Sequence, residues 1–288
     1  MPPIKKLFAV APQYIIPQHA LSSWMSRLTH CEHSAFKNAF IQLIIKLYGV
    51  NLAEAASQDL AAYPNFNAFF TRELRPGARP LAEGARAIVS PADGAISQIG
   101  AIDNGEIFQA KGRSYSAAEL LGGDAGLAAS FASGGFATIY LSPKDYHRLH
   151  MPVDGVLRRM IHIPGRLFSV NQITAQSAPR LFARNERVVC LFDTDFGPAA
   201  LVLVGAIFVN SIETVWHGVV TPPTRPAAQS WSYQDRNIRF QKGQEFARFN
   251  MGSTIIMLFP EHSIQWRADL AAGAPLRLGE RLGEGISG

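Results

Sequence analysis

Three short clusters of polar residues have types and spacings that could support chemistry. The first runs from Ser90 to Gly94, where Asp93 follows a β-branched run and precedes a glycine. Asp-Gly pairs are usually turn formers, so a structural role is the simpler interpretation of Asp93 taken alone. A carboxylate at this position could also orient a catalytic histidine.

The second cluster contains two histidines, His147 and His150, on either side of Arg148. On a helix, this spacing would place both imidazoles on one face, where a metal ion would need a further ligand. Candidates for that ligand are Asp145, Asp154 and His162. Flanking prolines argue against a long helix, so a general base or an anion-binding role is the better hypothesis for the histidines.

The third cluster is Gly252-Ser253-Thr254, inside a run of apolar residues that ends at Phe259. It lacks the Gly-x-Ser-x-Gly pattern of α/β-hydrolases. Because Gly252 has no Cβ, its peptide can distort and its carbonyl is open to attack by the Ser253 hydroxyl. Ser253, a histidine of the second cluster and Asp93 could together form a nucleophile, base and orienting carboxylate.

From about residue 85, short β-branched or aromatic runs alternate with Gly, Pro, Asn and Asp, which is typical of many short strands separated by turns. The predicted strands are 87–89, 94–99, 136–141, 187–192, 200–209 and 253–259. Ser116 and Glu119 have the spacing of a capping box, so one short helix should begin there.

The N-terminal region carries most of the positive charge. Residues 1–50 contain five basic residues and one acidic residue, a balance of +4 out of the chain's +5. The five basic residues are Lys5, Lys6, Arg27, Lys37 and Lys46. Residues 21–28 and 34–50 have the apolar periodicity of amphipathic helices. These helices could pack onto the rest of the protein or anchor it at a membrane interface.

Composition narrows the class of protein. The chain has 288 residues, of which 48% are hydrophobic, so it is not disordered. Two cysteines without Cys-x-x-Cys spacing favour neither a disulfide framework nor a structural zinc site. The longest apolar run, 199–209, is too short to span a bilayer, and we expect no cleaved signal peptide. We predict an α+β fold, with amphipathic N-terminal helices on a β-rich, barrel-like or sandwich-like domain.

In combination, the clusters resemble a phosphatidylserine decarboxylase of the bacterial type. The matching stretches occur in family order and are 91–94, 146–152, 185–187 with 205–216, and 252–254. They cover residues from about 65 to 260. The family's usual Leu-Gly-Ser-Thr has Met251 as its first residue here; since Leu and Met have similar volume, the change should not impair cleavage.

The resemblance implies a proenzyme that cuts itself between Gly252 and Ser253. The products would be a β chain of residues 1–252 and an α chain of residues 253–288, whose Ser253 becomes a covalent pyruvoyl group. Neither a metal nor pyridoxal phosphate would be needed. By the same resemblance, Asp93, His150 and Ser253 form a charge-relay set in which His150 is the base. His147 and Arg148 are the candidates for substrate binding.

The resemblance also implies a substrate and a location. A Schiff base between phosphatidylserine and the pyruvoyl carbonyl would accept electrons as CO2 leaves, giving phosphatidylethanolamine for phospholipid biosynthesis. Expected partners are an anionic membrane surface and the protein's own two chains as a heterodimer, without nucleic acid. We expect peripheral attachment at the cytoplasmic face of the cell membrane, through a helical segment 1–82 that precedes a catalytic domain 83–288.

Three alternatives remain open from the residues. A serine hydrolase would use Ser253, His150 and Asp93 in an intact chain. A pyruvoyl-dependent decarboxylase of a free amino acid would share the self-cleavage without needing lipid-binding helices. A non-enzymatic binding module is favoured only by the glycine-punctuated stretch 273–283, which resembles lipoyl-like barrels, and fold alone does not fix function.

Overall fold

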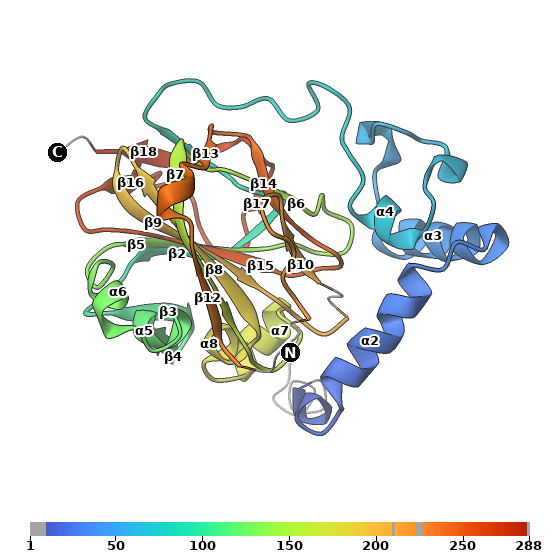
Figure 1. The fold of residues 1–288 in the computed structure, drawn as a ribbon, viewed down its shortest axis with the longest axis horizontal. Coiled ribbons are helices and arrows are strands. Elements are labelled where there is room, and N and C mark those ends of the chain that lie inside the picture. Colours follow the sequence, from blue (N-terminus) through green and yellow to red (C-terminus); the bar gives the residue numbers. More distant parts are fainter. Residues whose placement is uncertain (1–9, 209–210, 223–226, 287–288) are drawn as a thin grey trace.

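The computed structural model describes residues 10–208, 211–222 and 227–286. Its helices α2, α3 and α4 lie to one side of a body of packed β-sheets (Figure 1). The predicted α+β class is therefore confirmed. The largest sheet is open, because its described strands form a path with two ends rather than a closed ring.

The N-terminal helices form around an apolar cluster of their own. The helices are α2 (Gln18–Thr29), α3 (Ser34–Tyr48) and α4 (Phe66–Phe70), accompanied by the 3-10 turns Ala11–Tyr14, Leu52–Glu54 and Leu60–Ala62. Helix α3 ends at Gly49, whose φ of 69° is the left-handed conformation that glycine adopts without a steric penalty. The buried residues, called here the aromatic cluster, are Ile41, Val50, Tyr63, Phe66, Phe69 and Phe70.

Lys37 departs from the expected surface charge of this region. It is only 5% exposed, and its Nζ donates hydrogen bonds to the carbonyl oxygens of Leu60, at 3.0 Å, and Tyr63. Its charge therefore ties α3 to the turn before α4 instead of facing a partner. Lys5 and Lys6 lie outside the described residues, whereas Arg27 and Lys46 are exposed.

The main sheet has the strand order β12-β7-β8-β9-β15-β5-β2-β17, and β13 pairs with β7 beside this path. Its strands are β2 (Gly94–Ala101), β5 (Gly135–Tyr140), β7 (Gly155–Ile163), β8 (Arg187–Thr194), β9 (Gly197–Val204), β12 (Gln229–Ser232), β13 (Arg239–Phe240), β15 (Thr254–Phe259) and β17 (Pro275–Leu276). The predicted strands 94–99, 136–141, 187–192 and 253–259 match four of these to within two residues at each end. The strand expected at 200–209 ends earlier, at Val204, and residue 209 lies outside the described residues.

The other elements surround this sheet. A three-stranded sheet contains β1 (Ala87–Val89), β18 (Arg281–Gly285) and β16 (Ile264–Trp266); a four-stranded sheet contains β11 (Gly218–Val219), β10 (Ile212–Thr214), β14 (Glu245–Phe249) and β6 (Arg148–His150); β3 (Glu106–Ala110) pairs with β4 (Arg113–Ser116). The short helices are α5 (Ala117–Leu120), α6 (Ala125–Ala129), α7 (Gln172–Ser177), α8 (Leu181–Arg184) and the 3-10 turn Gln234–Arg236. The capping box predicted at the start of α5 is present.

Strand β15 lies in the middle of the main sheet and is buried along its whole length. Its side chains alternate between two apolar clusters: Ile255, Met257 and Phe259 face one, and Ile256 and Leu258 face the other. Burial on both faces explains why its sequence is continuously apolar instead of alternating with polar residues. Strand β15, which begins at Thr254 of the third cluster, is thus packed against an apolar cluster on each face.

Pairing brings the second and third clusters together. Strand β6 pairs with β14, which leads through residues 250–253 into β15. His150 is therefore in a strand and His147 is in the turn before it, so the helical arrangement considered for a metal site is wrong. The strand pairing, rather than any helix face, places the histidines near Gly252 and Ser253.

Candidate active site

Ser253 lies directly before β15, and its side chain is completely buried. Its carbonyl oxygen accepts a hydrogen bond from the Leu141 N–H at 2.9 Å, but its Oγ finds no hydrogen-bond partner among the described residues. A buried hydroxyl without a partner costs free energy, so its place in the structure calls for an explanation.

The residue that carries backbone strain is Met251. Its φ is 102°, a conformation that is costly for a residue with a Cβ. Gly252, where the sequence predicted distortion, does not have a φ in this range. The side chain of Met251 packs against the aromatic cluster, which holds this residue in place. Strain is therefore present, one residue before the predicted position.

The loop that contains Met251 is fastened by Asn250. Its Nδ2 donates to Ser211 Oγ at 2.5 Å, its N–H donates to the Ser211 carbonyl at 2.9 Å, and its Oδ1 accepts from Asn67 Nδ2 at 3.1 Å. Contacts on both sides of the loop leave little freedom for it to relax.

His147 is fully buried and lies beside Gly252. Its Nε2 is 3.9 Å from the position that a Cβ on Gly252 would occupy, and its ring lies 4.0 Å from that of Phe70 between centroids. Its Nδ1 lies 2.8 Å from the carbonyl oxygen of Asp145. Because a carbonyl can only accept, Nδ1 carries the proton and Nε2 carries the lone pair. Nε2 has no hydrogen-bond partner in the described part of the chain.

The protonation of both histidines is set by burial. Burial lowers the pKa of His147 to about 3, so the ring is neutral near neutral pH. Burial also lowers the pKa of His150. His150 Nδ1 is 2.7 Å from the carbonyl oxygen of Gly243, and Nε2 is 3.1 Å from the Tyr146 hydroxyl. In the described structure, His150 makes no hydrogen bond to Asp93 or Ser253.

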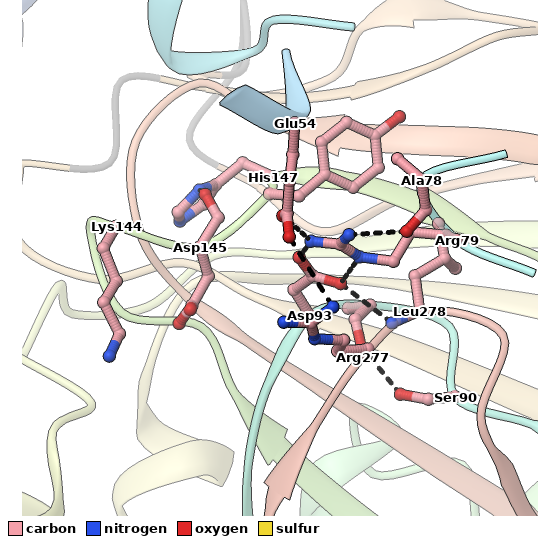
Figure 2. Close-up of polar contacts among 12 residues, drawn as sticks. Glu54, Ala78, Arg79, Ser90, Asp93, Lys144, Asp145, His147, Arg277 and Leu278 are labelled. Carbon is pink, nitrogen blue, oxygen red and sulfur yellow. Dashed lines mark hydrogen bonds and ion pairs between the residues drawn. The ribbon is translucent and has the colours of Figure 1, made fainter. Parts of the chain in front are cut away.

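Asp93 is nearly buried and is bonded to an arginine. Arg79 donates from Nε to Oδ1 at 2.8 Å and from Nη2 to Oδ2 at 2.6 Å, and the Leu278 N–H donates to Oδ1 at 2.8 Å (Figure 2). The His150 N–H donates to the Pro91 carbonyl at 2.9 Å, which places the Asp93 segment alongside β6. The three predicted relay residues are thus brought to one region, without direct hydrogen bonds between them.

Residues 66–284 match the model of a family described as phosphatidylserine decarboxylase, and residues 8–49 match a second model, described as PSD. The chain belongs to the phosphatidylserine decarboxylase family. The resemblance found in its motifs is therefore confirmed.

Relatives in this family match nearly the whole chain. A protein from Pseudomonas entomophila (strain L48) is 57% identical over 280 residues, which is 96% of this chain and 97% of its own. One from Pseudomonas putida (strain GB-1) is 55% identical over 98% of both chains. One from Acidovorax ebreus (strain TPSY) is 54% identical over 95% of this chain and 96% of its own. Each is named phosphatidylserine decarboxylase proenzyme.

Arg148 is a candidate substrate-binding residue of this member of the decarboxylase family. In the structure, its guanidinium is bonded to other groups of the protein. Its Nε donates to the Thr71 carbonyl at 2.8 Å, and its Nη1 contacts Glu73 at 3.1 Å and Glu245 at 3.0 Å. These contacts join β6 to β14 and to the segment after α4.

The candidate metal ligands do not come together. Among the described residues, no three His, Cys, Asp or Glu side chains form a group that could hold a metal ion. His162 Nε2 instead lies 3.1 Å from Glu186 Oε1. Arg187, the next residue after Glu186, donates instead to the backbone carbonyls of Glu119, Leu120 and Asn185.

Two cavities open near Asp93. One, of about 480 Å³, is lined by residues that include Arg72, Arg79, Asp93, Lys144, Asp145 and Arg277. The other, of about 670 Å³, shares Ala95 and Tyr140 with it. Tyr140, which lines both cavities, is paired in the sheet with Thr254, the residue after Ser253. Ser253 itself lines neither cavity in the described structure.

Four residues of the site were not identified from the sequence: Glu54, Arg79, Tyr146 and Gly243. Arg79 stands in the loop between Gly77 and Pro80, where the composition indicates only a boundary. Gly243 contributes a backbone carbonyl, which leaves no signature in the residue type. Tyr146 was visible as the neighbour of His147, but the turn that directs its hydroxyl to His150 is tertiary information.

Proposed function

We propose that this chain is a proenzyme that cleaves itself between Gly252 and Ser253 and then converts phosphatidylserine into phosphatidylethanolamine and CO2. The observation that carries the proposal is the unpartnered, buried Oγ of Ser253, two residues after strained Met251 and directly after Gly252, which lies beside the neutral ring of His147. The names of the relatives support the same activity.

Self-cleavage begins when Ser253 Oγ attacks the carbonyl carbon of Gly252 and gives its proton to an imidazole. The Gly252–Ser253 C–N bond breaks, and the proton returns to the released amine, leaving an ester. A base then removes the Cα proton of residue 253, its Cβ–Oγ bond breaks, and the Gly252 carboxylate leaves an unsaturated residue at position 253. Addition of water with loss of ammonia converts that residue into a pyruvoyl group.

We assign the base of this step to His150, oriented by Asp93, as the family resemblance implies. To reach Ser253, its Nε2 must exchange the Tyr146 hydroxyl for the serine hydroxyl. Its burial supports a basic role, because the lowered pKa keeps the ring neutral and able to accept a proton. The Gly243 carbonyl accepts from Nδ1–H and so fixes the tautomer that leaves Nε2 unprotonated. For Asp93 to orient the ring, its carboxylate must replace this carbonyl as the acceptor of Nδ1–H.

We assign a different role to His147. A pyruvoyl group at position 253 would supply a carbonyl that accepts electrons when the substrate loses its carboxylate. The unpartnered Ser253 Oγ and His147 Nε2 fit a group that forms at this position. His147 lies beside Gly252, the residue before this group, so we assign it the task of moving a proton to or from the substrate carbon.

We propose that the cavity of about 480 Å³ receives the anionic head group of the lipid. Lys144 and Arg277 are exposed at this cavity, and the buried Arg72 also lines it. Arg79 is bound closely by two carboxylates, whereas Arg277 contacts Glu54 only at 3.6 Å, so Lys144, Arg277 and Arg72 are the cations we assign to a phosphodiester or carboxylate of the substrate.

We propose peripheral binding to the cytoplasmic face of an anionic membrane through the N-terminal helices. Large apolar side chains are exposed along them: Ile15 at 87%, Trp24 at 56%, Leu43 at 57% and Leu47 at 66%. Such a row of aromatic and aliphatic side chains suits burial at the acyl boundary of a bilayer. Within the described residues, none of the helices has the length and apolar character needed to span a membrane.

The test is the intact mass of the purified protein under denaturing conditions, compared with Ser253→Ala. The wild type should give two chains divided at Gly252 and Ser253, and the smaller should be lighter than its encoded mass by one ammonia. Ser253→Ala should remain one inactive chain of about 31.4 kDa. An active, uncleaved wild type would instead favour the serine hydrolase.

Labelled substrates separate the remaining alternatives. Release of CO2 from vesicles that contain phosphatidylserine, and not from free amino acids, is the expected result. His147→Ala should cleave itself and fail to release CO2, whereas His150→Ala should fail to cleave. If these two phenotypes were exchanged, the roles assigned to the histidines would be exchanged as well.

A further inference from the structure

Asp93 is held by an arrangement that the family motifs do not include. The guanidinium of Arg79 lies between Asp93 and Glu54 (Figure 2). Its Nη2 donates to Asp93 Oδ2 and to Glu54 Oε2, both at 2.6 Å, and its Nε donates to Asp93 Oδ1 at 2.8 Å. Both partners and Arg79 itself are largely buried, with 8% of the Arg79 side chain exposed.

Two parallel N–H···O bonds fix a carboxylate in both position and rotation. The Leu278 N–H adds a third bond, to Oδ1 at 2.8 Å. Asp93 Oδ1 therefore accepts two hydrogen bonds and Oδ2 accepts one, so Oδ2 retains capacity for a further donor such as an imidazole N–H. The geometry orients the carboxylate without using up its ability to accept from a histidine.

Glu54 in turn holds Arg79. The backbone of Glu54 is fixed by the Arg75 N–H, which donates to its carbonyl at 2.9 Å. Its second carboxylate oxygen lies 3.6 Å from Arg277 Nη1. Hydrogen bonds to Asp93 and to Glu54 raise the pKa of Arg79, so its positive charge is permanent. One cation thus joins the end of the N-terminal helical region to Asp93.

From this geometry we infer that Arg79, anchored by Glu54, is the positioning residue that sets the orientation of Asp93 for self-cleavage. The inference rests on the proposed function, because it assigns Asp93 to the relay. Arg79 does not contact Ser253 or the cut peptide bond in the described structure. Its effect on the reaction passes through Asp93.

The experiment follows self-cleavage in time after cell-free synthesis, by the loss of the full-length chain on denaturing gels. The variants are Arg79→Gln, Arg79→Lys, Arg79→Ala with and without added guanidinium, and Glu54→Gln. A matched control is Arg267→Gln, since Arg267 binds Asp269 with the same paired geometry, at 3.0 and 2.5 Å, in an exposed loop. Thermal unfolding of each uncleaved chain reports on folding separately.

We expect Arg79→Gln to slow cleavage by about ten- to a hundredfold, by analogy with the cost of losing a partner that orients a metal ligand. Arg79→Lys should lie between this variant and the wild type, because an ammonium keeps the charge without the paired donors. Millimolar guanidinium should accelerate Arg79→Ala and leave the wild type unchanged. Glu54→Gln should slow cleavage by a smaller factor, and Arg267→Gln should not slow it.

The outcomes separate the inference from the proposed function. An uncleaved wild type would overturn the proposed function and this inference with it. If the wild type cleaves and folded Arg79→Gln cleaves equally fast, Arg79 has no positioning role. A slow Arg79→Ala that guanidinium does not accelerate, together with a Lys variant no faster than the Gln variant, would leave only a structural role and would also overturn the inference. If Arg79→Gln does not fold, the Lys variant and the guanidinium response decide.

Discussion

Met251 connects the strain in the backbone with the chemistry expected at the next peptide bond. A left-handed φ on a residue with a Cβ costs of order 1–3 kcal/mol. If cleavage releases that strain, Met251→Gly should slow it by about 5- to 150-fold, because glycine adopts the same φ without penalty. The rate of self-cleavage measures this effect directly.

Two controls belong to this prediction. Met251→Leu keeps the strain and restores the residue usual in the family, so it should cleave at the wild-type rate. Asn104→Gly places glycine at a position with a φ of 49°, in a turn distant in sequence, and should also have no effect. Equal rates for Met251→Gly and the wild type would show that the strain does not contribute.

Burial of His147 predicts a dependence of stability on pH. Its pKa is about 3 in the folded chain and about 6.5 when unfolded, so below pH 6.5 the unfolded state binds a proton that the folded state does not. Stability should therefore fall as the pH falls from about 6.5 toward 3, by about 2 kcal/mol at pH 5.

Urea unfolding of the uncleaved Ser253→Ala protein at pH 7 and pH 5 checks this expectation. Adding His147→Gln should remove about 2 kcal/mol of the loss between these pH values. His262→Gln, which replaces an imidazole whose side chain is 90% exposed, is the matched control. The same loss with and without His147 would contradict the assignment of a buried neutral ring.

At the scale of elements, one face of α3 packs against the protein and another is exposed. Ile41 and Lys37 hold it to the aromatic cluster and its neighbouring turn, while Leu43 and Leu47 are exposed. Leu43→Ser with Leu47→Ser should weaken binding to anionic liposomes by at least about tenfold, because burying each leucine contributes about 1.5–3 kcal/mol. Sedimentation with liposomes measures the loss.

The folded state should not be affected by this pair of changes, so thermal unfolding should match that of the wild type. Val219→Ser, which changes a 59% exposed residue of β11, is the control for losing an exposed apolar side chain elsewhere. Unchanged liposome binding in the double variant would place the membrane contact on another surface.

The elements were predictable where local rules decide them. The capping box at Ser116 and the apolar run of β15 each carry their own signal, and both appear where the sequence indicated. Lys37 shows the limit, since a lysine is ordinarily a surface residue and only the carbonyls of Leu60 and Tyr63 make its burial favourable.

The residues proposed for the candidate site could be chosen from the sequence by type, but their contacts could not. Asp93, the two histidines and Ser253 are brought to one region, but the partners of Asp93 come from positions 79 and 278. Such long-range pairings are made by the tertiary fold, and a single sequence contains no local pattern for them.

At the scale of the whole molecule, the residues after 252 pair with strands from the earlier part of the chain. Residues after 252 supply β15, β16, β17 and β18, and β15 pairs with β5 on one side and β9 on the other. We expect the two chains of the cleaved protein to remain associated through gel filtration under native conditions, without any covalent link.

Refolding should distinguish the cleaved from the uncleaved protein. After unfolding in urea and dilution, Ser253→Ala should recover its native elution volume with a yield independent of concentration. The cleaved protein should recover less well, and better as concentration rises, because its two chains must meet again. Equal recovery at all concentrations would contradict an essential role for the later strands.

Because Ser253 lies one residue before a paired strand, a cut there affects the two new chain ends differently. Thr254 is locked between Tyr140 and Val204, so the new first residue of the shorter chain stays where the sheet holds it. The other new end, Gly252, stays bonded to Met251 and to the loop that Asn250 fastens to Ser211 and Asn67. We therefore expect both new ends to stay near the site after cleavage, the reactive one held by the sheet and the carboxylate held by the loop.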